Sequence, residues 1–152
     1  EEVECIGGNA KMNEFCAAMG LCNLRHVEDE ISARAKVENY YRDRLSGVQG
    51  LTFIDQQPGI ESNHAYMPVF FEDSFGATRD EIFEALFEQG IVSRKYFYPL
   101  TSDFACYRNS FDSSETPIAK DRANRVLALP MYGGLSEEEV NRICNVIISC
   151  SI

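Results

Sequence analysis

The first hydrophobic stretch of the chain, residues 14–24, has the spacing of an α-helix and almost no polar face. Asn13 is its expected N-cap, and Glu14 places a negative charge in the first turn, where it favours the helix dipole. One apolar line consists of Met12, Phe15, Cys16 and Met19. A helix that is apolar nearly all round has to be covered by other parts of a protein. We therefore expect this helix to lie at a packed interface.

Residues 25–46 predict a long charged helix that ends at Gly47. Its apolar positions form two lines, which are Val27, Ile31 and Ala35 on one and Val37, Tyr41 and Leu45 on the other. Two acid–base pairs four residues apart, Glu30 with Arg34 and Glu38 with Arg42, occupy the outer face. We interpret this face as solvated and not as a binding site.

Two apolar stretches in the middle of the chain, 51–54 and 64–71, predict short strands separated by a polar loop. Pro68 has no N–H to give to a neighbouring strand, so it predicts an edge position or a bulge. A helix follows, opened by the capping-box pair Thr78 and Glu81 and ended by Gly90. Its inner face consists of Ile82, Ala85 and Leu86.

Residues 91–98 predict a third strand, and residues 102–115 predict an irregular surface segment. Thr116 and Pro117 begin a helix, and the apolar stretch 127–131 predicts a last strand. A second capping box opens the final helix, with Ser136 and Glu139 as the pair and Val140, Ile143, Cys144 and Ile147 as the buried stripe. This order of elements predicts an α+β domain with a short, mostly antiparallel sheet and helices packed on one face.

Composition excludes several classes of function. The net charge of −10 over 152 residues argues against nonspecific binding to nucleic acid or to anionic membranes. No apolar run approaches the roughly 20 residues that span a bilayer, and nothing resembles a signal peptide. The six cysteines lack metal-ligand spacing, so we expect reduced thiols in a cytoplasmic protein.

Catalytic and metal-binding motifs of the common kinds are missing. The two histidines, His26 and His64, lie in different elements without cysteines or carboxylates at ligand spacing, so we expect no metal site. The sequence contains no GxSxG, GxxxxGK[ST] or GxGxxG segment.

The segment SRKYFYPL, residues 93–100, is the main candidate for chemistry. Alternation along a strand would send Arg94, Tyr96 and Tyr98 to one side. One interpretation is a half-buried strand rich in tyrosine; the other is a rim that hydrogen-bonds a polyhydroxylated or phosphorylated ligand. The residue pattern alone leaves both open.

Five segments in order resemble the C-terminal half of the DegT/StrS-type sugar aminotransferases. These are GGNAKMNEFCAAMGL, NHAYMPV, EQGI, RKYFYPL and RVLALPMYGGLSEEEVNRI. The resemblance implies the small C-terminal domain of a fold-type I enzyme that uses pyridoxal phosphate to move an amino group, usually from glutamate, to a nucleotide-linked keto sugar. The amino-acid sequences of these segments look most like those of the enzymes that act on dTDP-4-keto-6-deoxyhexoses.

The resemblance also implies roles for individual residues. Asn9 matches an asparagine that reaches the cofactor phosphate in the partner subunit of a homodimer, and Lys11 stands where the family usually has arginine. Tyr96, Tyr98 and Arg94 match a segment near the substrate. Family members often carry histidine where this chain has Thr101.

In these enzymes a lysine within an S-x-x-K segment forms the Schiff base with the cofactor, upstream of the part matched here. None of the four lysines of this chain has a serine three residues earlier. We therefore expect a segment 1–24 that leads from a missing large domain and a small domain 25–152, inactive without the rest. The competing hypothesis is a stand-alone module that dimerises or binds a sugar nucleotide without catalysis.

Overall fold

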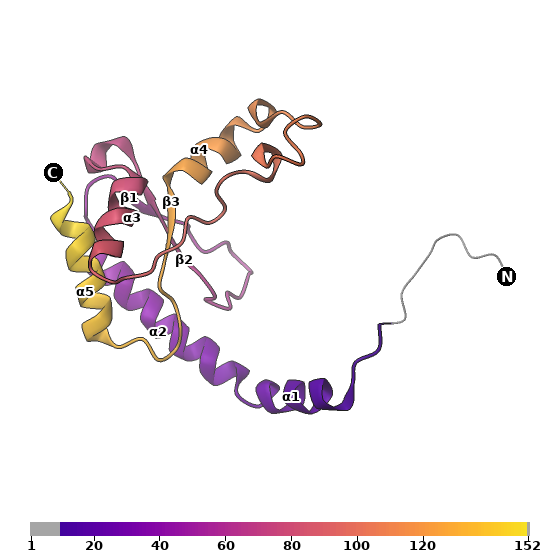
Figure 1. Ribbon diagram of the computed structural model, residues 1–152. Coiled ribbons are helices and arrows are strands. Elements are labelled where there is room, and N and C mark those ends of the chain that lie inside the picture. The colour runs from indigo at the N-terminus through magenta and orange to yellow at the C-terminus, as the bar shows by residue number, and fades with distance from the viewer. Residues whose placement is uncertain (1–9, 152) are drawn as a thin grey trace.

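The computed structural model describes residues 10–151 (Figure 1). Its helices are α1 (Glu14–Leu24), α2 (Val27–Leu45), α3 (Arg79–Glu88), α4 (Pro117–Arg125) and α5 (Glu137–Ser149). Its strands are β1 (Leu51–Phe53), β2 (Met67–Phe71) and β3 (Val126–Leu129), which form one antiparallel sheet in the order β1-β2-β3. The predicted α+β class is confirmed. None of the described helices is long and apolar enough to cross a membrane.

The hydrophobic core lies between one face of the sheet and three helices, α2, α3 and α5 (Figure 1). Along β2 the side chains alternate, so that Met67, Val69 and Phe71 point into this core. The helices contribute their predicted stripes, among them Val37, Tyr41, Leu45, Ile82, Leu86, Val140, Ile143, Cys144 and Ile147. Burial of these apolar side chains is the main force that holds the helices on the sheet.

The predicted helix ends are confirmed where side chains satisfy free backbone groups. Asn13 accepts a hydrogen bond from the backbone N–H of Cys16 at 2.9 Å, and both capping boxes form at the starts of α3 and α5. At the end of α3, Gly90 has φ 71° and Ile91 donates back to the carbonyl of Leu86 at 2.9 Å.

The outer face of α2 is not the solvated face that the sequence predicts, because one of the two acid–base pairs does not form and the other is partly buried. Glu38 and Arg42 pair at 2.8 Å, whereas Glu30 and Arg34 form no ion pair in the part of the chain that the structure describes. Glu30 instead lies against the backbone of Gly133, where an added Cβ would come within 2.8 Å of its carboxylate. This part of α2 is therefore packed against a loop.

The edge position predicted from Pro68 is wrong, because β2 is the central strand. Pro68 stands opposite Ala128, whose own N–H and C=O bond to Arg94 on the other side of β3. The Pro68 nitrogen therefore faces β1, and β1 ends at Phe53, one residue before it would need that missing donor. Proline is tolerated here because β1 ends before the residue that would accept a hydrogen bond from its nitrogen.

The junction of α4 and β3 has no intervening loop, because α4 ends at Arg125 and β3 begins at Val126. Arg79 of α3 is only 3% exposed and holds this junction from inside. Its guanidinium donates to the carbonyls of Ala123 and Val126 at 3.0 and 3.2 Å. Three elements are thus tied together at one buried side chain.

The helix α1 projects from the body of the molecule beyond the N-terminal end of α2 (Figure 1). None of its residues is buried, and Phe15 and Met19 are 89% and 63% exposed. The cover that its sequence predicts is therefore not supplied by the described residues of this chain.

Candidate functional site

The segment between α3 and α4 contains the predicted site residues but is not the strand predicted for residues 91–98. Only Arg94 pairs with the sheet, through two backbone hydrogen bonds with Ala128 at 3.0 and 2.8 Å. The chain then turns at Tyr96 and Phe97. The predicted alternation fails because it needs an extended backbone throughout.

Arg94 and Tyr96 are brought together. The guanidinium of Arg94 donates a hydrogen bond to the hydroxyl of Tyr96 and lies 5.6 Å from the centre of its ring. The same ring stacks on Phe97 at 5.1 Å and meets the edge of Tyr66 at 5.6 Å. Tyr96 is therefore held on several sides by cationic and aromatic neighbours.

Tyr98 does not join this group, so the prediction that it shares a side with Tyr96 is wrong. Its ring lies 4.6 Å from the guanidinium carbon of Arg79. The turn at Tyr96 and Phe97 redirects the chain toward α3, which explains the separation.

Two hollows adjoin at the Tyr66–Tyr96 pair. The first, which we call the tyrosine pocket, has a volume of 500 Å³ and is lined by Arg94 and three tyrosines, Tyr66, Tyr96 and Tyr132, with Val92, Pro130 and Met131 among the apolar residues. The hydroxyls and the guanidinium can donate hydrogen bonds to hydroxyl or phosphate oxygens, while the rings offer apolar faces.

The second hollow, the apolar pocket, has a volume of 410 Å³ and lies on the face of the sheet opposite the core. Its lining is almost entirely apolar and includes Pro68, Phe70, Phe97, Leu100, Val126 and Ala128. Tyr66 and Tyr96 line both pockets and form the wall between them.

Sequence reasoning missed Tyr66 and Tyr132 as site residues. Both lie inside segments that carry the family resemblance, NHAYMPV and LPMYGG. The signal was present in those segments, but only the fold places them beside Arg94 and Tyr96.

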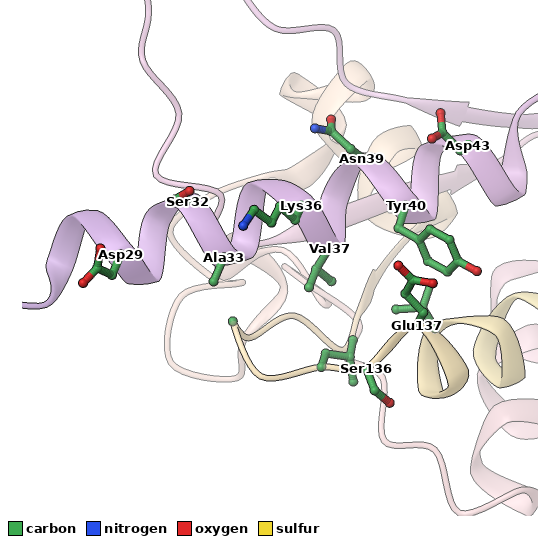
Figure 2. Close-up of a pocket in the computed structure, with 13 residues that line it drawn as sticks. Asp29, Ser32, Ala33, Lys36, Val37, Asn39, Tyr40, Asp43, Ser136 and Glu137 are labelled. Atoms are coloured by element: carbon green, nitrogen blue, oxygen red, sulfur yellow. The ribbon is translucent and has the colours of Figure 1, made fainter.

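A third hollow is a groove of 790 Å³ between α2 and the loop that leads into α5 (Figure 2). Asp29, Lys36, Asp43 and Glu137 bring three negative charges and one positive charge to it. The groove contains none of the predicted site residues and none of the buried polar atoms without a hydrogen-bond partner. It therefore gives no reason to assign a ligand there.

Of the two predicted cofactor contacts, only one lies within the described residues, and it does not line the tyrosine pocket. Asn9 is among the residues that the structure does not describe. Lys11 is exposed in the stretch that precedes α1, at the far end of that projecting helix (Figure 1). Within residues 10–151 no three His, Cys, Asp or Glu side chains are grouped so that they could hold a metal ion.

None of the four lysines lines the tyrosine pocket or the apolar pocket. Lys95 pairs with Asp80 at 2.6 Å, and Lys120 donates to the hydroxyl of Ser113 at 3.2 Å. Lys11 and Lys36 are exposed.

Solved structures with the same arrangement of elements include aminotransferases. The structure of DesI in the presence of its TDP-sugar product matches with a TM-score of 0.86 and 30% identity, covering 95% of this chain and 37% of that one. Helicobacter pylori PseC, an aminotransferase involved in the biosynthesis of pseudoaminic acid, matches with a TM-score of 0.84 at 22% identity, over 99% of this chain and 40% of that one. The fold is thus one found in the aminotransferases that depend on pyridoxal phosphate.

The chain belongs to the DegT/DnrJ/EryC1/StrS aminotransferase family, which matches residues 1–148. Among its relatives, the dTDP-4-amino-4,6-dideoxy-D-glucose transaminase of Escherichia coli is 40% identical over 148 residues, which are 96% of this chain and 40% of the relative. The Shigella dysenteriae transaminase of the same name is 34% identical, over 95% of this chain and 40% of its own length. The resemblance seen in the sequence is confirmed, and the chain spans about 40% of the length of these curated relatives.

Proposed function

We propose that this chain is the C-terminal part of an aminotransferase that moves an amino group from glutamate to a nucleotide-linked keto-deoxysugar, with a dTDP-linked 4-keto-6-deoxyhexose as the favoured class. The observation that carries the proposal is the 40% identity with a dTDP-sugar transaminase, which extends over 96% of this chain. Residues 1–24 would lead from a large domain, and residues 25–152 would form the small domain.

The exposed surface of α1 supports this division. Aromatic, sulfur-containing and aliphatic side chains are exposed along its length, among them Phe15, Met19, Leu21 and Leu24. Soluble proteins rarely leave such a surface in water unless a partner covers it. We propose that the large domain and the second subunit of a homodimer supply that cover.

The site residues divide by the chemistry that each can offer. Arg94 and Tyr96 would bind and orient the sugar nucleotide at the tyrosine pocket, through a guanidinium and a hydroxyl. Tyr98, which is 48% exposed beside Arg79, would contact the substrate from its free edge. Asn9 and Lys11 would reach the phosphate of pyridoxal phosphate across the dimer.

Pyridoxal phosphate would supply the electron sink that amino transfer requires, and it needs a lysine to hold it. Because the lysines of this chain are exposed or paired away from the pockets, we propose that this lysine lies on polypeptide outside these 152 residues. The chain alone would then bind but not catalyse.

The test is covalent trapping of the cofactor. The 152-residue chain and a longer product of the same gene are each incubated with pyridoxal phosphate and reduced with borohydride, and labelled peptides are located by mass spectrometry. We expect one lysine of the longer protein to be labelled stoichiometrically at a position outside the 152 residues, and no lysine of the chain to be labelled to that extent.

Stoichiometric labelling of Lys11 in the chain alone would overturn this proposal. A start codon directly before the codon of Glu1, together with binding of a dTDP-sugar by the chain alone, would instead favour the stand-alone binding module. Reading the codons before Glu1 separates the two cases.

A further inference from the structure

A single carboxylate on α2 holds both ends of the long loop between β1 and β2. Glu38 uses one oxygen to accept from Arg42 at 2.8 Å and the other to bond the Nδ1 of His64 at 2.7 Å. Its side chain is only 15% exposed. Since an ionised carboxylate can only accept, the Nδ1 of His64 must carry the proton.

Arg42 anchors the beginning of this loop for a reason that lies in the sheet. Ile54 would follow β1 opposite Pro68, which has no N–H to donate, so the carbonyl of Ile54 has no partner in the ladder. Arg42 donates to that carbonyl at 2.9 Å, and its guanidinium lies 5.0 Å from the ring centre of Phe53. Pro68 thus leaves the carbonyl of Ile54 without a backbone donor, and Arg42 supplies a donor in its place.

His64 anchors the end of the loop, two residues before the tyrosine that divides the pockets. It has φ 50°, in the left-handed region that residues other than glycine rarely adopt. Tyr66 follows, 57% exposed, with its ring edge against Tyr96 at 5.6 Å. The next residue, Met67, begins β2 and is buried in the core.

We propose that Glu38, Arg42 and His64 act as a clamp that positions Tyr66 as the wall between the tyrosine pocket and the apolar pocket. His64 is then a positioning residue and Tyr66 a further residue of the site. The clamp concerns this chain alone; only its effect on substrate binding rests on the proposed function.

The clamp matters because the other hydrogen bonds of this loop join loop residues only to one another, such as His64 N–H to the hydroxyl of Ser62 at 3.0 Å. Residues 54–66 contain no regular secondary structure, and an exposed tyrosine there has to lose rotamer freedom to form a wall. Burial raises the pKa of Glu38, but hydrogen bonds from His64 and Arg42 and their charges outweigh it and hold this pKa below its usual value. The carboxylate is therefore ionised under ordinary conditions.

The test observes Tyr66 directly by ¹⁹F NMR of the full 152-residue chain with 3-fluorotyrosine at its seven tyrosines. Tyr66→Phe and Tyr96→Phe assign the two signals. We expect His64→Ala and Glu38→Ala each to shift and broaden both signals, because the ring pair loses its fixed geometry. The buried Tyr41, which donates to the carbonyl of Pro130 at 3.1 Å, reports whether the core stays folded.

His64→Asn provides the rescue. The amide nitrogen of asparagine stands as many bonds from Cα as the histidine Nδ1 does, and asparagine tolerates a positive φ, so it can still donate to Glu38. The matched control is Arg125→Gln, which breaks the pairs with Asp73 and Asp121 and does not line the tyrosine pocket or the apolar pocket. Both variants should leave the Tyr66 and Tyr96 signals unchanged.

Unchanged Tyr66 and Tyr96 signals in Glu38→Ala, with the Tyr41 signal native, would overturn the clamp. So would a failure of His64→Asn to restore the signals. A failure of the proposed function has a different signature: the ¹⁹F changes would appear as expected, while the longer protein would not bind a sugar nucleotide.

Discussion

The cysteines of this chain lie in opposite environments. Cys16, Cys22 and Cys106 are exposed, whereas Cys144 is 0% exposed in the stripe of α5, and the five cysteines within the described residues are free thiols. Burial raises the pKa of Cys144 to about 11, although Arg44 nearby opposes the shift. Because the thiolate is the reacting species, burial and a high pKa both slow its alkylation.

We therefore expect iodoacetamide at pH 8 to modify the exposed cysteines of the native chain first and Cys144 only after urea unfolds the protein. Peptide mass spectrometry after a short pulse measures this order. Modification of Cys144 as fast as that of Cys106 would show that α5 is not packed as described.

At the residue scale the sequence predicted roles that depend on near neighbours and missed those that depend on distant ones. The N-cap Asn13 needs only the backbone three residues ahead, and it forms as predicted. Tyr66 and Tyr96 are separated by 30 positions in the chain and meet only in the fold. No local pattern could show that contact.

At the scale of elements, the capping box of α5 and the start of α4, which has no side-chain cap, allow a matched test of helix stability. The hydroxyl of Ser136 accepts from the backbone N–H of Glu139, so Ser136→Ala should lower the free energy of unfolding by about 1 kcal/mol. Thr116 precedes α4 without capping it through its side chain, so Thr116→Ala should cost less than half as much. Urea unfolding followed by circular dichroism measures both.

The stabilisation of α5 by its capping box depends on pH, and the direction of this dependence follows from Glu139. Hydrogen bonds from the backbone and then the hydroxyl of Ser136 lower the pKa of Glu139 below its usual value. The contribution of the ionised Glu139 is therefore present above the ordinary carboxylate pKa and is lost as the pH falls through the lowered one. Equal stabilities of the two alanine variants at neutral pH would contradict the role of the cap.

Helices were predicted better than strands because helix signals are local. Capping residues and the apolar stripe of α5 appear together in one stretch of sequence. The strand predicted for residues 91–98 shrank to one bridge at Arg94, since the chain turns at Tyr96 and Phe97, where the backbone N–H of Tyr98 donates to the carbonyl of Lys95 at 3.1 Å. The central place of β2 depends on the order of strands, which Pro68 alone could not indicate.

At the scale of the whole molecule, the exposed α1 predicts how the chain behaves in solution. We expect it to bind a hydrophobic dye and to associate as its concentration rises, and Phe15→Ser with Met19→Ser to reduce both effects. Phe87→Ser is the control, because Phe87 is 62% exposed on α3, a helix packed against the body. Dye fluorescence and sedimentation velocity are the measurements.

A monomer without affinity for the dye would argue against a missing partner for α1. The sequence predicted both the apolar character of this helix and the class of the domain, since each follows from periodicity. The structure adds that α1 stands apart from the body and that none of its residues is buried (Figure 1).

The Arg79 junction limits how the molecule can move. A helix joined to a strand by a loop can tilt without disturbing the sheet, but α4 continues directly into β3. In addition, the guanidinium of Arg79 donates hydrogen bonds to a carbonyl of each of these two elements. A force applied to α4, such as a ligand pressing on the apolar pocket beside it, is therefore passed to β3 and α3 as a rigid unit. We therefore expect adaptation to ligands of different shape to come from the loops that flank this unit.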